Sequence, residues 1–289
     1  MFTISEEAKQ YYTFTLADKD ANSEIEVVPE RGGIITRWRQ DGKEILYLDE
    51  PRYKDPSRTV RGGVPILFPI CGNLPDDIFN HQNNAYKIIQ HGFGRHLSWK
   101  VLEQDTSNCA SITVSIESNP ETLAVYPFEF AVSYTYQLKG NSLKILQTYT
   151  NKSNQDMPFS AGFHPYFQVG DKEKFSVDIP GTKYEDNVSK KTLDFSGKFD
   201  YDIPEIDAAF TSISASTTSF SDRDLNRKIT INYSDFFTTL VFWTLEGEDF
   251  ICLEPWSTPR NGINTGKQLN VLAPGASYDA EIEMICESI

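Results

Sequence analysis

The sequence of 289 residues predicts an all-β fold in a single domain spanning residues 1–289. Residues 128–138 carry an apolar or aromatic side chain at every second position, which is the period of a strand with one buried face. Aromatic residues make up 13% of the chain and favour β-structure. No linker and no internal repeat interrupts the chain, and helical patterns are scarce. Many short strands at fairly regular spacing predict one sandwich or barrel.

The individual strands are predicted from short apolar runs that are bounded by turn residues. In chain order they span residues 11–17, 24–28, 34–39, 44–48, 110–117, 128–138, 142–151, 228–233, 237–245, 250–256 and 277–286. Asp41-Gly42 is a strong hairpin signal between two of these strands. Residues 157–169 are apolar, and residues 211–219 form either a polar strand or a loop. One turn of helix is expected at residues 120–125, behind Asn119.

Three stretches are predicted to be irregular. Residues 50–57 and 61–77 are rich in proline or glycine, which interrupt regular structure. Residues 170–205 are charged and rich in loop-forming residues.

Composition limits the partners of the chain. The formal net charge of −14 makes nucleic acid and anionic membrane surfaces poor partners, and an anionic substrate would need a local cationic pocket. The longest apolar run, at residues 64–71, is too short to cross a bilayer. Four cysteines without a CxxC pair indicate free buried thiols in a reducing compartment. No apolar signal segment is visible at the N-terminus, so we expect a cytoplasmic protein.

A carboxylate, Glu254, lies within the apolar strand predicted at residues 250–256. In a strand, Cys252, Glu254 and Trp256 share one face. Pro255 holds the preceding residue in an extended conformation. Because burial of a lone carboxylate is very costly, Glu254 is either a member of a structural ion pair or a group used in chemistry.

Four other polar residues stand in loop or aromatic contexts. His164 follows Phe163 in FHPYF and is either a satisfied core histidine or a positioned acid or base. Arg61 precedes two glycines, which permit close backbone approach. His91 and Arg95 lie in QHGFGR. Each arginine either points into a cavity or forms a surface ion pair.

The motifs RGGVPILFP, QHGFGR, FHPYF, EIDAAF and LEPW occur in this order between Arg61 and Trp256. This set resembles the galactose-mutarotase-like family of aldose 1-epimerases, and most of all its branch of hexose-6-phosphate mutarotases, also called glucose-6-phosphate 1-epimerases. The resemblance implies an antiparallel β-supersandwich. It also implies interconversion of the α and β anomers of a hexose by acid and base catalysis, without a cofactor or metal. We expect a small-molecule sugar or sugar phosphate as partner, and a monomer or weak dimer.

The resemblance also assigns roles to seven residues. They are Glu254 as general base, His164 as general acid, Asp207 as a holder of sugar hydroxyls, Arg61, Gln90 and Arg95 as substrate-binding residues of the phosphosugar branch, and His91 as a substrate contact of the free-sugar relatives. In HPYF, many relatives have another residue after the histidine, and the insert at 171–205 is hard to align. We expect acidic surroundings to keep His164 protonated.

Three alternatives remain open at this level. The chain could be a free-aldose mutarotase, acting on galactose or glucose. A glycosidase would use two carboxylates, of which Glu254 and Asp207 are candidates. A non-catalytic carbohydrate-binding protein could share the same fold, because a fold does not fix a function.

Overall fold

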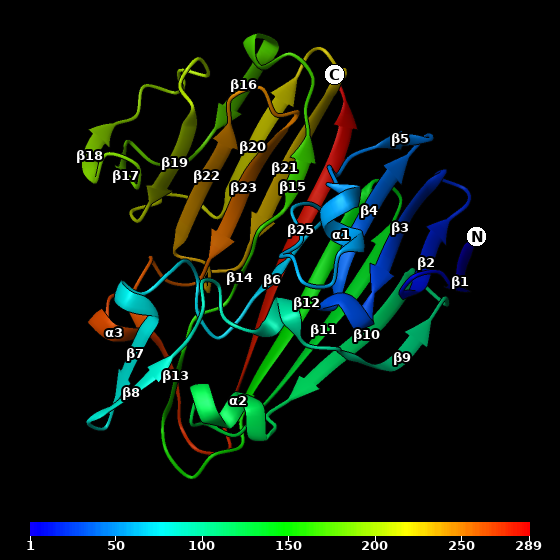
Figure 1. Ribbon diagram of the computed structural model, residues 1–289. Helices are drawn as coiled ribbons and strands as arrows, with labels where there is room; N and C mark the ends of the chain where they lie inside the picture. The colour runs from blue at the N-terminus through cyan, green and yellow to red at the C-terminus, as the bar shows by residue number, and fades with distance from the viewer.

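The computed structural model describes residues 1–289 and consists mainly of antiparallel strands (Figure 1). Two eight-stranded sheets and one five-stranded sheet account for most of the chain, so the predicted all-β antiparallel architecture is confirmed. We call the three sheets the central sheet, the long sheet and the N-terminal sheet. None of the helices combines the length and the apolar composition that a membrane-spanning helix needs.

The central sheet carries the candidate site. Its order is β18-β17-β19-β22-β23-β14-β6, with β15 also paired to β23. Its strands are β6 (Ile66–Leu67), β14 (Gly162–Phe163), β15 (Tyr166–Gln168), β17 (Lys183–Asp186), β18 (Lys191–Asp194), β19 (Glu205–Phe210), β22 (Thr239–Leu245) and β23 (Phe250–Trp256). All seven residues of β23 are buried, as expected for a strand covered on both faces.

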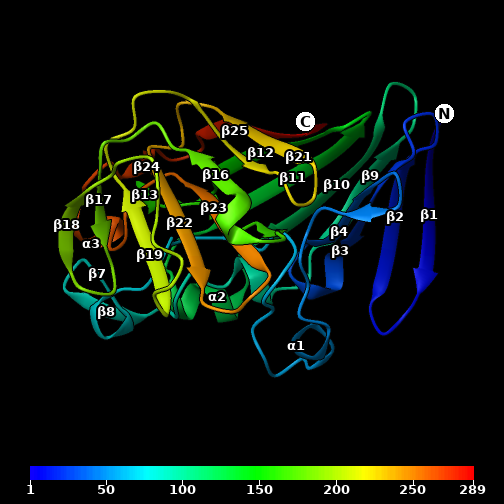
Figure 2. The ribbon, with the colours of Figure 1, turned by 90° about the horizontal axis from the view of Figure 1, so that it is seen from above.

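The long sheet forms a second layer next to the central sheet. In the view from above it lies along the upper side of the picture, with the central sheet below it (Figure 2). Its order is β16-β20-β21-β25-β12-β11-β10-β9. Its strands are β9 (Lys100–Asp105), β10 (Ala110–Glu117), β11 (Phe130–Lys139), β12 (Ser142–Asn151), β16 (Phe175–Asp178), β20 (Thr217–Asp222), β21 (Arg227–Tyr233) and β25 (Ser277–Ser288). Burial alternates along β11 and β12, so one face of each strand packs into the core.

The remaining elements form the edges and connections. The N-terminal sheet contains β1 (Phe2–Ala8), β2 (Tyr12–Asp18), β3 (Ser23–Val28), β4 (Ile34–Gln40) and β5 (Lys43–Glu44). Two short ribbons pair β7 (Ile78–His81) with β8 (Asn84–Lys87), and β13 (Met157–Phe159) with β24 (Asn270–Leu272). The helices are α1 (Glu50–Lys54), α2 (Pro120–Val125) and α3 (Gly262–Thr265), and the 3-10 turns are η1 (Pro29–Arg31), η2 (Pro75–Asp77), η3 (Gly94–His96) and η4 (Lys172–Lys174).

Aromatic side chains fill the space between the central and long sheets. Phe167 of β15 packs edge-on against Phe220 of β20, with ring centroids 5.1 Å apart. Ile251 and Leu253 of β23 also belong to this buried core, whereas Cys252 lies in a separate cluster on the other face. The predicted division of β23 into two faces is therefore confirmed, and one face is left for the site.

Several predicted elements match the structure closely. The predictions at residues 142–151 and 250–256 coincide with β12 and β23. The helix predicted at residues 120–125 is α2, where Asn119 accepts a hydrogen bond from the backbone of Thr122 and so caps the first turn. Residues 61–77 contain only the two-residue strand β6 and the 3-10 turn η2, as their glycines and prolines predict.

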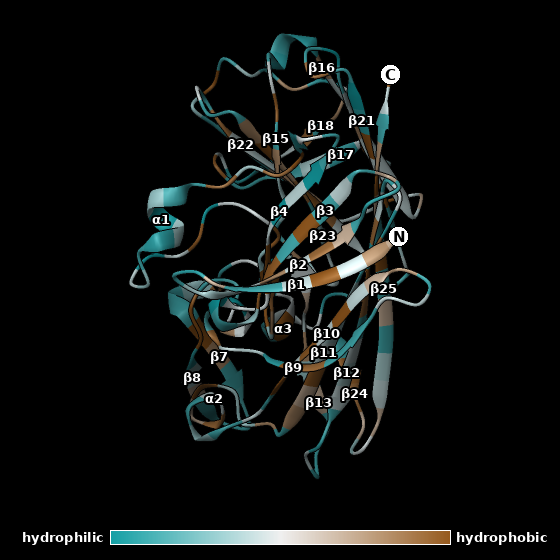
Figure 3. Ribbon diagram, turned by 90° about the vertical axis from the view of Figure 1, so that its right-hand side faces the viewer, coloured by the Kyte–Doolittle hydropathy of each residue, from teal (hydrophilic) through white to brown (hydrophobic).

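Other predictions were wrong in detail. Residues 50–57 begin with α1, because Asp49 caps the helix and Pro51 fits its first turn; this helix lies at the edge of the molecule and is mostly hydrophilic (Figure 3). Residues 170–205 contain three short strands, β16, β17 and β18. The prediction also missed β1, whose outer half is exposed and polar and therefore gives no apolar signal. Cys109 is only partly buried, unlike the other three free thiols.

Candidate active site

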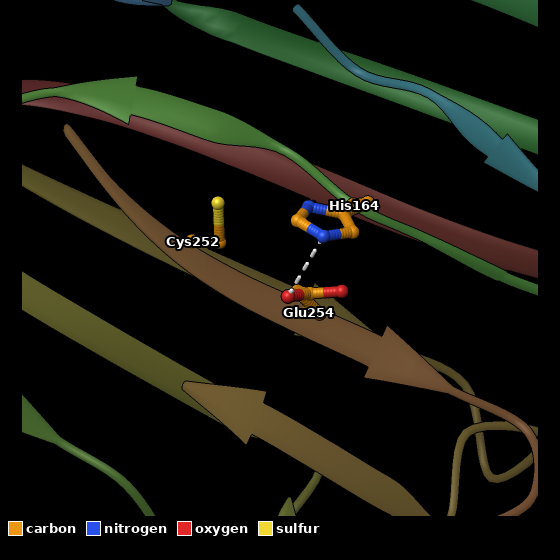
Figure 4. Close-up of side chains that lie close together, drawn as sticks. All are labelled: His164, Cys252 and Glu254. Carbon is orange, nitrogen blue, oxygen red and sulfur yellow. Dashed lines mark ion pairs between the residues drawn. The ribbon is translucent and has the colours of Figure 1, made fainter. Parts of the chain in front are cut away.

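Two side chains meet on the face of the central sheet that points away from the long sheet. The strand beside β23 is interrupted at His164 and Pro165, with β14 before the gap and β15 after it. Both halves keep one register against β23: the paired residues are Gly162 with Trp256 and Tyr166 with Cys252. This register places His164 opposite Glu254, and their atoms Nε2 and Oε1 are 3.4 Å apart (Figure 4).

The backbone holds the imidazole over the sheet. The N–H of His164 donates to the carbonyl of Pro65 at 3.1 Å rather than to β23. The ring stacks almost parallel on Tyr166, with centroids 4.7 Å apart and planes 8° apart. Only 9% of His164 is exposed, yet its Nδ1 has no hydrogen-bond partner. The side chain is therefore placed by packing, with its Nε2 aimed at the carboxylate.

Glu254 is buried without a permanent cationic partner. It is 1% exposed, and its Oε2 accepts one hydrogen bond, from the indole Nε1 of Trp256 at 3.1 Å. Burial raises the pKa of Glu254 well above its usual range, and the carboxylate of Asp207 adds to this rise. Such a carboxylate is a stronger base than an exposed one.

The expectation that His164 is protonated was wrong. Burial and the nearby guanidinium of Arg95 lower the pKa of His164 to about 3. The net negative charge of the whole chain does not decide this pKa, because the guanidinium groups of Arg95, Arg260 and Arg61 all lower it. Both members of the pair therefore favour their neutral forms, in which Glu254 holds the proton between them and the ring of His164 keeps only the single N–H proton of a neutral imidazole. Transfer of that proton from Glu254 to His164 gives a carboxylate and an imidazolium. Because the pKa of His164 is so low, its imidazolium is a strong acid that gives up its proton readily.

All seven residues predicted for the site line one cavity of about 260 Å³. The lining consists of Arg52, Thr59, Val60, Arg61, Gln90, His91, Arg95, His164, Tyr166, Glu205, Asp207, Val241, Trp243, Glu254, Trp256 and Arg260. The structure thus brings together the seven predicted residues, which lie up to 193 positions apart in the chain, from Arg61 to Glu254. Their roles in binding or catalysis stay predictions.

Glycines let two loops approach the cavity. Arg61 precedes Gly62, where a Cβ atom would lie 2.5 Å from the Cα of Leu48. Gly92 follows His91 with φ of +70°, and a Cβ atom there would overlap the carbonyl of Phe68. A side chain at either glycine would push its loop outward, so these positions favour glycine.

The two predicted arginines do not form ion pairs with carboxylates. The guanidinium of Arg61 lies over the ring of Trp243, at 5.6 Å from its centroid. Arg95 donates from one terminal nitrogen to the carbonyl of Gln90 at 2.8 Å, and its Nε is buried without a partner. Burial lowers the pKa of Arg95 to about 10. The surface ion-pair alternative is therefore wrong for both residues.

Asp207 is held by a residue that the sequence reasoning missed. Arg260 forms an ion pair with its carboxylate at 3.1 Å. The same guanidinium lies 5.6 Å from the ring centroid of Trp256 and donates to Asn73 at 2.7 Å. Arg260 lies in the turn after β23, where no local pattern distinguishes it from a surface arginine. The other missed charged residues of the cavity are Arg52 and Glu205.

His91 is a second buried imidazole at the cavity. Its Nδ1 accepts a hydrogen bond from the N–H of Gly72 at 3.1 Å, so the neutral ring carries its proton on Nε2. Burial, together with Arg95, lowers the pKa of His91 well below its usual range. The ring lies edge-on to His164, with centroids 5.5 Å apart. His91 can therefore donate a hydrogen bond at the cavity without being charged.

Three potential metal-ligand atoms also lie close together, two of them on residues that line the cavity and the third on the buried Cys252. One donor atom each from His164, Cys252 and Glu254 lies within 4.8 Å of the other two. These residues offer nitrogen, sulfur and oxygen, and all three are buried. No such site was expected from the sequence.

The chain matches one protein family and is similar to several individual proteins. The model of the family described as aldose 1-epimerase matches residues 12–284. The chain is 29% identical to protein LacX of Lactococcus lactis over 271 residues, which are 82% of this chain and 86% of LacX. It is also 29% identical, over 172 residues, to a Cenchrus ciliaris protein with the provisional name glucose-6-phosphate 1-epimerase, covering 55% of this chain and 49% of that protein. The crystal structure of Slr1438 from Synechocystis is 42% identical, with a TM-score of 0.96 over 100% of both chains.

Proposed function

Because the chain belongs to the aldose 1-epimerase family, we propose that it interconverts the α and β anomers of a hexose 6-phosphate. Its antiparallel sandwich is the galactose-mutarotase-like fold. One observation carries the choice of a phosphorylated sugar: Arg61 and Arg95, neither of them neutralised by a carboxylate, line the same cavity as His164 and Glu254.

Opening of the sugar ring needs one base and one acid, which act on the two oxygens bonded to C1. Glu254 takes the proton of the C1 hydroxyl while His164 gives a proton to the ring oxygen, and the bond between C1 and the ring oxygen breaks. Both oxygens are bonded to C1, so two groups that touch each other can reach both of them. Rotation about C1–C2 and closure on the other carbonyl face give the other anomer. Each proton passes back in the closing step, which leaves the pair as it began.

The charges of the cavity favour a dianionic substrate. Four arginines and three carboxylates line it, whereas the whole chain has a formal net charge of −14. Guanidinium groups bind phosphate oxygens two at a time, and burial strengthens such contacts. Asp207 already pairs with Arg260 and Asp49 with Arg52, which leaves Arg61 and Arg95 for the substrate. The provisional name of the Cenchrus ciliaris relative agrees with a phosphosugar.

The test compares two substrates in two variants. We expect wild-type kcat/KM, measured by polarimetry or exchange NMR, to be much higher for glucose 6-phosphate than for glucose. Arg95→Ala should weaken use of glucose 6-phosphate by about 1.5–3 kcal/mol, the value of one charge-assisted hydrogen bond, with little effect on glucose. Arg58→Ala is the matched control, because Arg58 is exposed and lies outside the cavity lining.

Each alternative has its own outcome in this test. A wild-type ratio near one, or an equal loss for both sugars in Arg95→Ala, would make the protein a free-aldose mutarotase. Binding of sugar without any anomer exchange would make it a carbohydrate-binding protein. Release of an aglycone from a glycoside would make it a glycosidase that uses Glu254 and Asp207.

A further inference from the structure

Three kinds of metal ligand lie in one small volume at the cavity, whose lining includes His164 and Glu254 while Cys252 is fully buried next to them. Cys252 and Glu254 are two residues apart on β23 and point to the same face, and His164 lies beside them in the gap between β14 and β15 (Figure 4). The Sγ of Cys252, a nitrogen of His164 and a carboxylate oxygen of Glu254 all lie within 4.8 Å of one another. The proposed epimerase reaction uses two of these residues and leaves the thiol without a task.

The spacing is close to that of a tetrahedral site. Zn²⁺ binds nitrogen and oxygen at about 2.0–2.2 Å and thiolate sulfur at about 2.3 Å, which places the ligand atoms of a tetrahedron roughly 3.3–3.7 Å apart. The nitrogen of His164 and the oxygen of Glu254 are 3.4 Å apart already. A shift of about 1 Å by the sulfur of Cys252 would complete three corners of such a site. The fourth corner would then be open for water.

We propose that His164, Cys252 and Glu254 bind one thiophilic divalent cation of the Zn²⁺ type, and that the bound cation blocks the epimerase reaction. The second half rests on the proposed function, because the ion would occupy the proposed acid and base. Sulfur selects Zn²⁺ over Mg²⁺ and Ca²⁺, which prefer oxygen ligands. On binding, Cys252 loses its thiol proton and Glu254 its carboxyl proton, both to water, so that the metal is bound by a thiolate and a carboxylate.

The surroundings make this a reversible site rather than a permanent one. The thiolate and the carboxylate together balance the two charges of the ion. In permanent zinc sites the second ring nitrogen of a ligating histidine is hydrogen-bonded, whereas Nδ1 of His164 has no partner. Arg61 and Arg95 line the same cavity and oppose a cation. A phosphorylated substrate, which these arginines attract, should displace the metal.

Binding is tested with Co²⁺ as a spectroscopic probe, under a reductant that does not bind metals. We expect one Co²⁺ per chain and a thiolate-to-metal charge-transfer band in the wild type. Cys252→Ala should abolish the band, and Glu254→Gln should weaken Co²⁺ binding by more than about 10-fold, since even outer-shell changes typically cost 10–100-fold. Cys109→Ala is the control, because Cys109 is the most accessible thiol and lies outside the cluster.

The result that overturns the site is a band that survives in Cys252→Ala or disappears in Cys109→Ala. Circular dichroism of each variant shows whether it is folded. If Cys252→Ala does not fold, Cys252→Ser with the same Co²⁺ titration replaces it, and the sulfur band must again be lost. No Co²⁺ or Zn²⁺ binding by the folded wild type would also refute the proposal.

Inhibition is tested separately from binding. Zn²⁺ should lower anomer exchange by the wild type, a chelator should restore it, and increasing hexose 6-phosphate should relieve it. Each Cys252→Ala rate is compared with the rate of the same variant without Zn²⁺, and this ratio should stay near one. Zn²⁺ that binds without inhibiting would refute the blocking role alone. A protein that exchanges no anomers would refute the proposed function, while the Co²⁺ band would still decide the metal site.

Discussion

At the scale of single residues, mutation of Glu254 is the most direct test of the proposed base. Glu254→Gln keeps the shape of the side chain but removes its basicity, so anomer exchange should fall by about 100-fold or more. Exchange NMR under saturating substrate measures the loss. The melting temperature of the variant should stay close to that of the wild type, because a neutral amide suits the buried position. Near-normal exchange would mean that another group is the base.

Trp256 tunes that base through one hydrogen bond. Its indole is the single donor to Glu254, and this donor stabilises the carboxylate against the effect of burial. Trp256→Phe removes the donor and should raise the pKa of Glu254 further. Because the base must be ionised, the rising limb of the pH–rate profile should move to higher pH. Trp243→Phe is the control, since that indole donates to Glu205 instead; an equal shift in both variants would refute the role of the hydrogen bond.

The sequence could predict the residues of the site that lie in recognisable motifs. Glu254 stands out as a carboxylate in an apolar strand, and His164 as an imidazole between aromatic residues. It could not predict Arg260, whose importance comes only from its contacts with Asp207 and Trp256. It also gave the wrong protonation state for His164, because net charge says little about the few charges that surround one buried ring.

At the scale of elements, the interrupted strand between β14 and β15 positions the proposed acid. His164→Asn keeps a polar side chain at the interruption but removes the titrating ring. We expect kcat to fall far more than KM rises, because the proton is delivered only in the transition state. Steady-state kinetics on both anomers measures this division. A change in KM alone would make His164 a binding residue, with His91 as the next candidate for the acid.

The elements that the sequence predicted well are those with a long, regular pattern. The alternation along residues 128–138 and the apolar run of β23 each extend over a whole strand. The strands that were missed, such as β17 and β18, have four residues each and are largely exposed. Their pairing is decided by contacts with distant segments, which a single stretch of sequence does not reveal.

At the scale of the whole molecule, buried neutral histidines should make the fold sensitive to acid. His91 and His164 have lowered pKa values in the folded protein, whereas in the unfolded chain both bind protons below about pH 6.5. The unfolded state then holds more protons, so stability falls as the pH falls from 6.5 toward 4. Each histidine should contribute a slope of up to about 1.4 kcal/mol per pH unit.

Urea unfolding at several pH values measures this slope. In the His164→Asn variant, one of the two histidines no longer contributes, so the free energy of unfolding should depend less steeply on pH between 6 and 4.5. Glu254 acts in the opposite direction, because its raised pKa lowers stability as the pH rises above about 4.5. An unchanged slope in the variant would mean that His164 is not buried as a neutral ring.

The global shape and the cavity differ in how far the sequence could predict them. Strand spacing was enough for the all-β class, because it depends on local patterns that recur along the chain. The cavity depends on long-range pairing, which brings Arg61, Arg95 and Glu254 to one place. At the level of the sequence, only the resemblance to a family predicted that these residues belong to one site. The strand register gives a physical reason for part of that arrangement, because it places His164 opposite Glu254.

The placement of His164 opposite Glu254 has a consequence for how such a protein can change over time. Their separation is fixed by backbone pairing to β23, whereas Arg61 lies in a loop and Arg95 in the 3-10 turn η3, neither of which is part of that pairing. New loop sequences can therefore alter which sugar enters while the reactive pair keeps its spacing. Evolution, or a designer who grafts loops from a relative, can in this way change the substrate that the protein binds while the spacing of His164 and Glu254 is kept.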